Sequence, residues 1–110
     1  MKKLIAIAFT VITAISFGLA SPALAGNAAH GGQIFGANCA ACHANGNNVV
    51  NAQKTLKKEA LKEYGKDTIE AISYQVKNGN GAMPAFGSKL SDADIEDVAT
   101  YVLSQAESGW

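Results

Sequence analysis

The sequence contains no arginine, and all nine of its basic residues are lysines. From residue 26 onwards the chain carries seven lysines and nine acidic residues, a net charge of −2. A protein that binds the phosphate backbone of a nucleic acid needs a basic stripe and a positive domain charge. The composition therefore excludes nucleic acid from the expected partners.

Cysteine is also scarce, because the chain has only Cys39 and Cys42, three positions apart. A disulfide between them would close a loop too short to constrain the fold. The 85 residues from 26 to 110 are enough for one domain but bury a thin core, and domains of this size are marginal without an additional staple. We expect that staple to be something other than a disulfide.

The chain has one long apolar run, Leu4 to Leu19, and that run is near the amino terminus. It is shorter than the ~20 apolar residues that a membrane-spanning helix needs. Lys2 and Lys3 precede it, and the small-residue pattern Ala23-Leu24-Ala25 follows it, which is typical of a cleaved signal peptide. We therefore expect residues 1–25 to be removed and residues 26–110 to form an exported domain without stable membrane insertion. The alternative is an uncleaved membrane anchor.

No segment alternates polar and apolar residues over the length of a strand, so the expected fold class is all-α. Helical patterns cover residues 27–40, 55–63, 67–79 and 91–105. The third begins with Asp67 and Glu70 at capping-box spacing, and the fourth begins at Ser91, whose hydroxyl can cap a helix. Residues 44–53 are rich in Asn and Gly and predict a loop.

The run Cys39-Ala40-Ala41-Cys42-His43 has the C-x-x-C-H pattern of c-type haem attachment. Residues three apart on a helical turn project to the same side, so both sulfurs can form thioethers with the two vinyl groups of one haem edge. His43 then follows as the proximal iron ligand. The predicted staple is therefore one covalent haem c, with its iron.

Two other chemistries use the same residue types. A thioredoxin-like thiol pair needs its C-x-x-C in a βαβ context, which this sequence does not show, and it leaves His43 without a role. A structural zinc site needs four ligands. The chain from residue 26 offers two cysteines and two histidines, with His30 poorly placed relative to the others.

Met83 is the only methionine after residue 25 and stands between glycines, directly before Pro84. Glycines let the backbone approach a haem closely, and Pro84 restricts Met83 to extended geometry. We expect Met83 to be the sixth iron ligand, with His30 as the competitor for that position. A gap-filling methionine in the core is the purely structural alternative.

Ligation by histidine and methionine leaves no open iron site for oxygen or peroxide, which favours electron transfer over catalysis. The chain is therefore expected to be an electron carrier and not an enzyme. The competing function is a haem-based peroxidase or gas sensor in which Met83 is displaced.

These residues together resemble the cytochrome c6 family of cyanobacteria and algae. The resemblance is carried by residues 34–43, Met83 to Gly87, Asp97 to Leu103 and the terminal Gly109-Trp110. It implies a class I cytochrome c fold with about four helices, present as a monomer in the thylakoid lumen or periplasm. It also implies transient docking, with electrons taken from the cytochrome b6f complex and delivered to photosystem I or, as a second route, to a terminal oxidase.

The resemblance also implies roles for individual residues. Gln75 would lie beside Met83 against the haem and tune the reduction potential of the haem. The alternative is that Gln75 is a half-exposed residue at the edge of the helix with no such role. Lys89 stands where many family members have an arginine used in docking, and lysine lacks the planar fork of arginine. Gly32 and Phe35, with Tyr101, are expected to form a close crossing of the first and last helices.

Charge is unevenly distributed along the chain. Five lysines fall within thirteen residues, Lys54, Lys57, Lys58, Lys62 and Lys66, and four acidic residues open the last helix, Asp92, Asp94, Glu96 and Asp97. Such asymmetry speeds the encounter with a charged partner more than it adds affinity. A solvated helix face is the alternative interpretation of the lysines.

Overall fold

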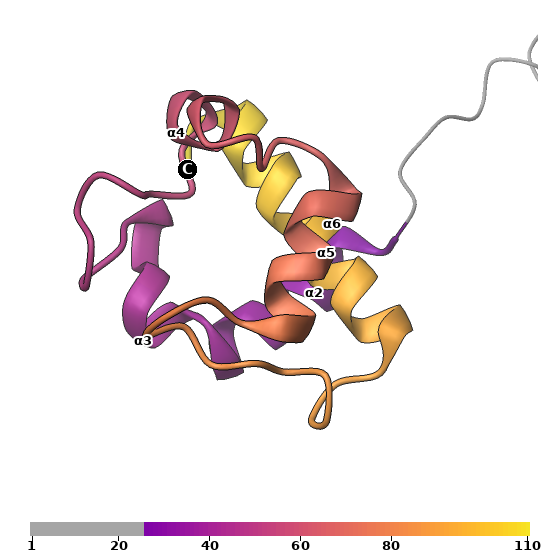
Figure 1. Ribbon diagram of the computed structural model, residues 1–110. Coiled ribbons are helices and arrows are strands. Elements are labelled where there is room, and N and C mark those ends of the chain that lie inside the picture. Colours follow the sequence, from indigo (N-terminus) through magenta and orange to yellow (C-terminus); the bar gives the residue numbers. More distant parts are fainter. Residues whose placement is uncertain (1–25) are drawn as a thin grey trace, which may run out of the picture.

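The computed structural model describes residues 26–110, and the predicted signal peptide, residues 1–25, lies outside the described residues. The regular elements of the described chain are helices joined by loops (Figure 1): α2 (Ala28–Asn38), α3 (Ala40–His43), the 3-10 turn η2 (Ala44–Gly46), α4 (Lys58–Glu63), α5 (Ile69–Asn78) and α6 (Asp92–Ser108). Within residues 26–110 the only strand-like pairing is an isolated bridge between Asn80 and Met83. The expected all-α fold class is confirmed. In this part of the chain no helix is both long and apolar enough to cross a membrane.

The ends of α5 and α6 show how the sequence positions these helices. The predicted capping box of Asp67 and Glu70 is wrong, because α5 is capped by Thr68, whose hydroxyl accepts from the Ala71 backbone N–H at 3.0 Å. The predicted cap of α6 is confirmed. Ser91 accepts from the Asp94 N–H at 3.0 Å, and the Asp94 carboxylate accepts from the Ser91 N–H at 3.3 Å.

The other helices differ from their predicted lengths. The first predicted helix is divided, because α2 ends at Asn38 and the short α3 carries Cys42 and His43. The second, α4, begins at Lys58 and has only six residues. The last helix, α6, extends to Ser108, three residues beyond the predicted end. Each correction concerns a helix end, where a single side chain or turn decides whether the helix continues.

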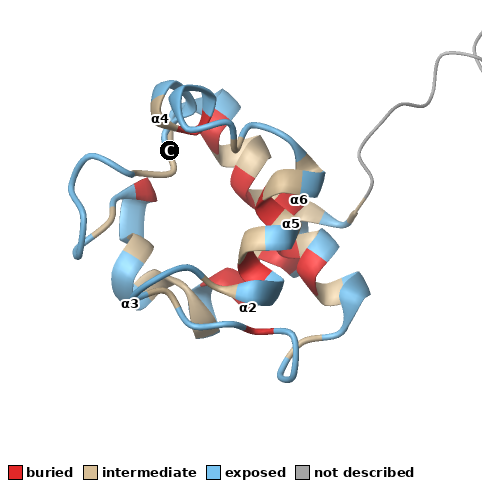
Figure 2. Ribbon diagram, viewed as in Figure 1, coloured by how far each residue is buried: buried red, intermediate tan, exposed pale blue. Residues whose placement is uncertain are grey.

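The core lies where α2, α5 and α6 pack together, and their facing sides are the buried ones in Figure 2. Phe35 of α2 meets Tyr101 of α6 at 5.3 Å between ring centroids, and a Cβ on Gly32 would be 3.0 Å from the Tyr101 ring. The predicted crossing of the first and last helices is therefore confirmed. Gly31, which the sequence analysis did not single out, makes the tighter contact, because a Cβ there would overlap the Asp97 carbonyl oxygen.

Candidate functional site

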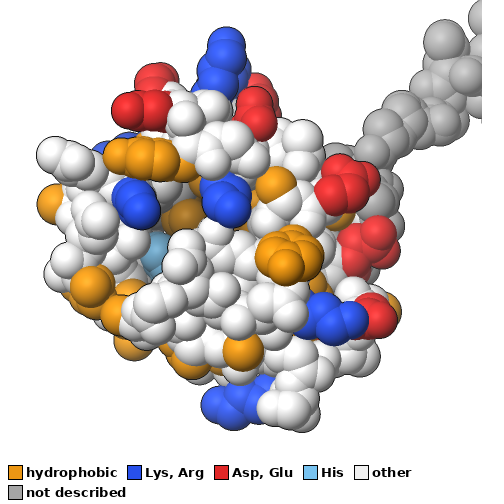
Figure 3. All heavy atoms as spheres, viewed as in Figure 1, with side chains coloured by type: hydrophobic (Ala, Val, Ile, Leu, Met, Phe, Trp, Pro, Cys, Tyr) orange, Lys and Arg blue, Asp and Glu red, His pale blue; other side chains and the backbone are white. Residues whose placement is uncertain are grey.

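A cavity of about 420 Å³ lies beside this core. Every residue predicted for the site lines it: Cys39, Cys42, His43, Gln75 and Met83. Its walls come from distant parts of the chain and are largely apolar, including Phe35, Leu61, Ile72, Val76, Phe86 and Val98. Figure 3 shows the hollow from one side, with hydrophobic side chains inside it and lysines above it. The size and lining are those of a site for a sizeable apolar group with a few polar anchors.

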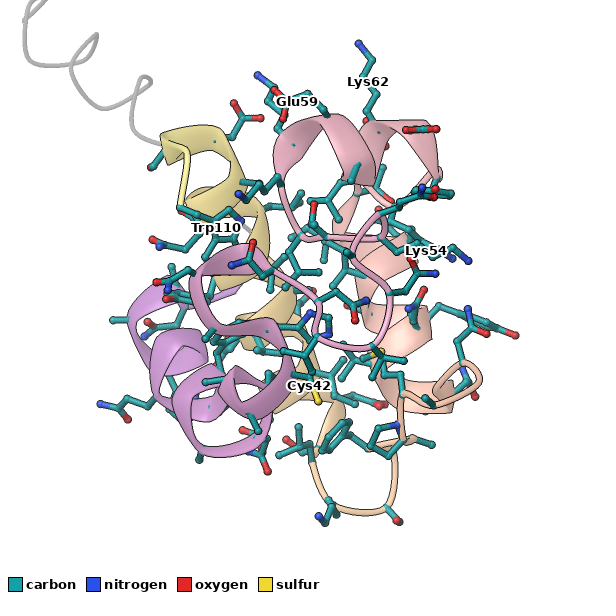
Figure 4. All side chains as sticks on the ribbon, turned by 90° about the vertical axis from the view of Figure 1, so that its left-hand side faces the viewer. Cys42, Lys54, Glu59, Lys62 and Trp110 are labelled. Atoms are coloured by element: carbon teal, nitrogen blue, oxygen red, sulfur yellow. The ribbon has the colours of Figure 1, made fainter. Side chains whose placement is uncertain are left out.

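The two cysteines are free thiols on one side of the cavity, Cys39 half-buried and Cys42 exposed. In Figure 4 Cys42 lies between α3 and the loop that follows α5. Burial raises the pKa of the Cys39 thiol from 9.0 to about 11. A thiol oxidoreductase needs the opposite change, a lowered cysteine pKa that supplies the thiolate. The Cys39 thiol is therefore poorly suited to the thioredoxin-like alternative.

His43 is oriented by a hydrogen bond from its own loop. Its Nδ1 lies 2.9 Å from the carbonyl oxygen of Asn47, and because a carbonyl can only accept, Nδ1 carries the proton. The lone pair on Nε2 is then free to bind a metal. The turn that returns Asn47 to His43 passes through Asn45 and Gly46, which have φ values of 57° and 77°.

Met83 is half-buried and is fixed by its backbone as well as its side chain. The Asn80 and Met83 backbones exchange two hydrogen bonds of 3.0 Å, and Gly79 lies so close that a Cβ there would be 2.7 Å from the Met83 carbonyl oxygen. The side-chain amide Nε2 of Gln75 donates to the Met83 sulfur at 3.5 Å. Gln75 is thus partly buried with a polar partner, beside Met83 as the resemblance implies.

His30 does not line this cavity. Its Nδ1 lies 2.7 Å from the Asp97 carboxylate. The pKa of Asp97 is lowered from its ordinary 3.8, first by the hydrogen bond from the Asn27 backbone N–H and then by His30. Among the described residues no three cysteine, histidine or acidic side chains converge on one point. With His30 held at Asp97, the two cysteines and two histidines of the zinc alternative are not brought together.

The cavity's donor set fits a haem c. Two thiols, an imidazole and a thioether face one apolar space, and these are the attachment and axial groups of c-type haem. The apolar walls suit a flat macrocycle, and Nε2 of His43 is left free by the Asn47 hydrogen bond. Asn47 leaves no signal in the sequence, because it contributes a backbone carbonyl, which any residue type supplies.

Lysines surround the cavity unevenly. Lys54 and Lys66 line it, and the Lys54 ammonium lies 5.3 Å from the centre of the Tyr64 ring. Lys58 instead pairs with Glu107 at 3.2 Å. Lys89 is exposed, and its ammonium lies 5.6 Å from the Phe86 ring centre, within reach of a cation–π contact. Part of the lysine cluster therefore borders the cavity and part covers a solvated helix face.

Comparison with known proteins places this arrangement in a family. A family model described as subunit III of cbb3-type cytochrome c oxidase matches residues 26–102. Cytochrome c6 of Pyropia yezoensis is 54% identical over 110 residues, spanning 100% of both chains. Cytochrome c6 of Picosynechococcus sp. is 56% identical over 115 residues, covering 98% of this chain and 97% of its own.

A solved structure gives the same result. Cytochrome c6 of the diatom Phaeodactylum tricornutum superposes with a TM-score of 0.76 and is 56% identical, covering 77% of this chain and 100% of its own. Similarity therefore extends to both the sequence and the overall fold.

Proposed function

Because the chain belongs to the cytochrome c6 family, electron carriers of photosynthesis with one covalent haem c in a class I cytochrome c fold, we propose how its own residues hold that haem. Cys39 and Cys42 would form the two thioether bonds, and His43 and Met83 would hold the iron. The observation that carries this proposal is that all four donors line one apolar cavity. The haem, when bound, supplies a one-electron couple at its iron.

The chain's own residues set the conditions for that couple. Asn47 holds the His43 ring in one tautomer and orientation, and Gln75 donates to the Met83 sulfur and restricts its position. The apolar walls exclude water. Since no general acid, base or nucleophile is needed, the role is that of a carrier and not of an enzyme that transforms a substrate.

Docking at the cavity side is the proposed route for electrons. The partners are the cytochrome b6f complex as donor and photosystem I as acceptor, with a terminal oxidase as an alternative acceptor. Lys54 and Lys66 at the cavity steer the encounter with negatively charged surfaces. A carrier must dissociate quickly, so the contact should bury less than ~1,200 Å² in total, with the protein acting as a monomer.

Location follows from processing. Cleavage after Ala25 would leave residues 26–110 as one mature domain in the thylakoid lumen or periplasm. Intact mass of the exported protein tests this directly. The expected value is that of a chain starting at Gly26 plus one haem, and a mass that includes residues 1–25 contradicts it.

The competing function, a peroxidase or gas sensor, requires that Met83 leaves the iron. Against this stand the two backbone hydrogen bonds to Asn80 and the contact with Gln75. The deciding experiment is a visible spectrum of the haem-loaded protein, oxidised and reduced, with carbon monoxide added to the reduced form. A low-spin c-type spectrum unchanged by carbon monoxide supports the carrier. A rapid shift with carbon monoxide supports the sensor or peroxidase.

A further inference from the structure

The last residue of the chain turns back onto the fold. Gly109 follows α6 in the left-handed conformation, with a φ of 94°, and the Trp110 N–H then donates to the Gln105 carbonyl at 2.9 Å. This reversal places the indole against Phe35 and Tyr101, at centroid distances of 5.5 and 6.1 Å. Figure 4 shows Trp110 beside the helices and next to the loop after η2.

Trp110 also contacts that loop directly. Its indole Nε1–H donates to the carbonyl of Leu56 at 2.9 Å, a partner 54 residues away in sequence. The face of the ring covers Gly46, since a Cβ on Gly46 would lie 2.6 Å from ring carbons. A single side chain therefore joins the two ends of the loop to the core.

The same two loop ends lead to His43. The Leu56 N–H donates to the Gly46 carbonyl at 2.8 Å, and the next residue, Asn47, provides the carbonyl bonded to His43 Nδ1. Between residues 44 and 55 only Gly46 is buried. Two local backbone hydrogen bonds, from the Asn47 N–H to Ala44 and from the Val49 N–H to Cys42, hold this segment beside α3. The loop has little other apolar anchorage, so the Trp110 contacts are what tie the segment around the Asn47 carbonyl to the core.

We propose that Trp110 is a positioning residue for His43: it holds the Gly46–Leu56 pair and thereby fixes the carbonyl that orients the imidazole. This rests on the proposed function, because it takes His43 as an iron ligand. Loss of a group that orients a metal-bound histidine through its second nitrogen lowers metal affinity or activity by roughly 10- to 100-fold. Trp110 acts one contact farther out, through the backbone.

The test uses the haem-loaded protein with two variants. Trp110→Phe keeps an aromatic ring but loses the N–H donor to Leu56, and deletion of residue 110 removes both. NMR of the oxidised form reports the hyperfine-shifted ring protons of His43, and exchange in deuterated water reports its Nδ1 proton. We expect shifted His43 resonances and an exchange rate raised roughly fivefold in Trp110→Phe, as the loss of one hydrogen bond makes local opening more frequent, and more in the deletion.

The matched control is Ile95→Val, which removes one methyl group from a buried α6 residue outside the cavity lining. It weakens the core without touching the loop, so the His43 resonances and exchange should stay as in the natural protein. If Trp110→Phe behaves like the natural protein, or if Ile95→Val changes His43 equally, the positioning role is wrong. If the natural protein itself shows no iron-bound histidine, the proposed function fails, and this inference fails with it. If the deletion variant loses its haem, the His43 resonances and Nδ1 exchange rate of Trp110→Phe alone test the positioning role.

Discussion

Gly31 of α2 lies directly against the backbone carbonyl of Asp97 in α6, so closely that a Cβ at residue 31 would overlap that oxygen. Only a residue without a side chain permits this approach. The contact sets the distance between the two helices that cross beneath the cavity, and Phe35, four residues further along α2, lines the cavity wall. A single glycine therefore permits the close approach of two helices, one of which supplies part of the cavity wall.

This contact predicts opposite effects for two alanine substitutions in the same helix. Gly31→Ala should lower the free energy of unfolding by about 1–3 kcal/mol, because it overpacks the helix crossing. Gly36→Ala meets nothing within 4 Å and should raise it by roughly 0.5–1 kcal/mol through better helix propensity. Urea unfolding of the haem-loaded variants measures both, and equal effects would contradict the close crossing.

Replacement of Met83 should open the sixth iron position. Met83→Leu keeps the side-chain volume but loses the sulfur, so its reduced form should bind carbon monoxide and lose the low-spin spectrum. Ala85→Ser, at an exposed residue of the same loop, is the control and should remain insensitive to carbon monoxide. A Met83→Leu variant without carbon monoxide binding would show that another residue fills the site.

Gln75 should raise the reduction potential through its bond to Met83. Its N–H donor draws electron density from the ligand sulfur and so disfavours the oxidised iron. Gln75→Val should lower the potential by about 40 mV, the equivalent for one electron of a hydrogen bond worth ~1 kcal/mol. Gln33→Val, on the exposed side of α2, is the control in the same redox titration. Equal potentials for Gln75→Val and the natural protein would remove this role.

The lowered pKa of Asp97 predicts a contribution to folding stability that is lost in acid. Its pKa is lowered by the Asn27 N–H at 2.8 Å and by His30 at 2.7 Å. Because the folded pKa lies below the unfolded one, the stabilisation is complete above about pH 4–5 and is lost as the pH falls through the folded pKa. Asp97→Asn should be less stable than the natural protein at pH 7, by less than about 1 kcal/mol, since the pair is partly exposed.

That difference should shrink as unfolding is measured at successively lower pH. Glu96→Gln alters an exposed acidic residue next to Asp97 in α6 and should show no such convergence. A constant gap between Asp97→Asn and the natural protein from pH 7 to pH 3 would mean that the lowered pKa does not contribute to folding.

The lysines at the cavity should govern reactions with charged electron acceptors. Replacing Lys54 and Lys66 with glutamine should slow electron transfer to ferricyanide, an anion, by a factor of roughly 2–10 at low ionic strength, and salt should remove the difference. Lys77→Gln is the control, because Lys77 lies outside the cavity lining and pairs with Asp92 at 3.2 Å. If Lys77→Gln slows the stopped-flow rate as much as the replacement of Lys54 and Lys66 does, steering by the lysines at the cavity is contradicted.

The chemistry of the site was predictable because it depends on residues that are neighbours in sequence or have one possible source. The spacing from Cys39 to His43 predicts the haem attachment from five consecutive residues, and Met83 is the only methionine after residue 25. The helices followed from periodicity, and the cap at Ser91 followed from its side chain. Where capping residues stood side by side, as at Asp67 and Thr68, the pattern indicated the wrong one.

The order of residues was enough to predict a haem c, the all-α class and the approximate helices, because these arise from covalent spacing and short-range periodicity. Three contacts became visible only in the folded chain: Gly31 meets Asp97, the Asn47 carbonyl orients His43, and Trp110 reaches Leu56 across 54 residues. These contacts join backbone groups, which every residue type carries, or residues far apart in the chain. Neither kind of contact leaves a pattern in the order of side chains, because such contacts form only once the helices have packed.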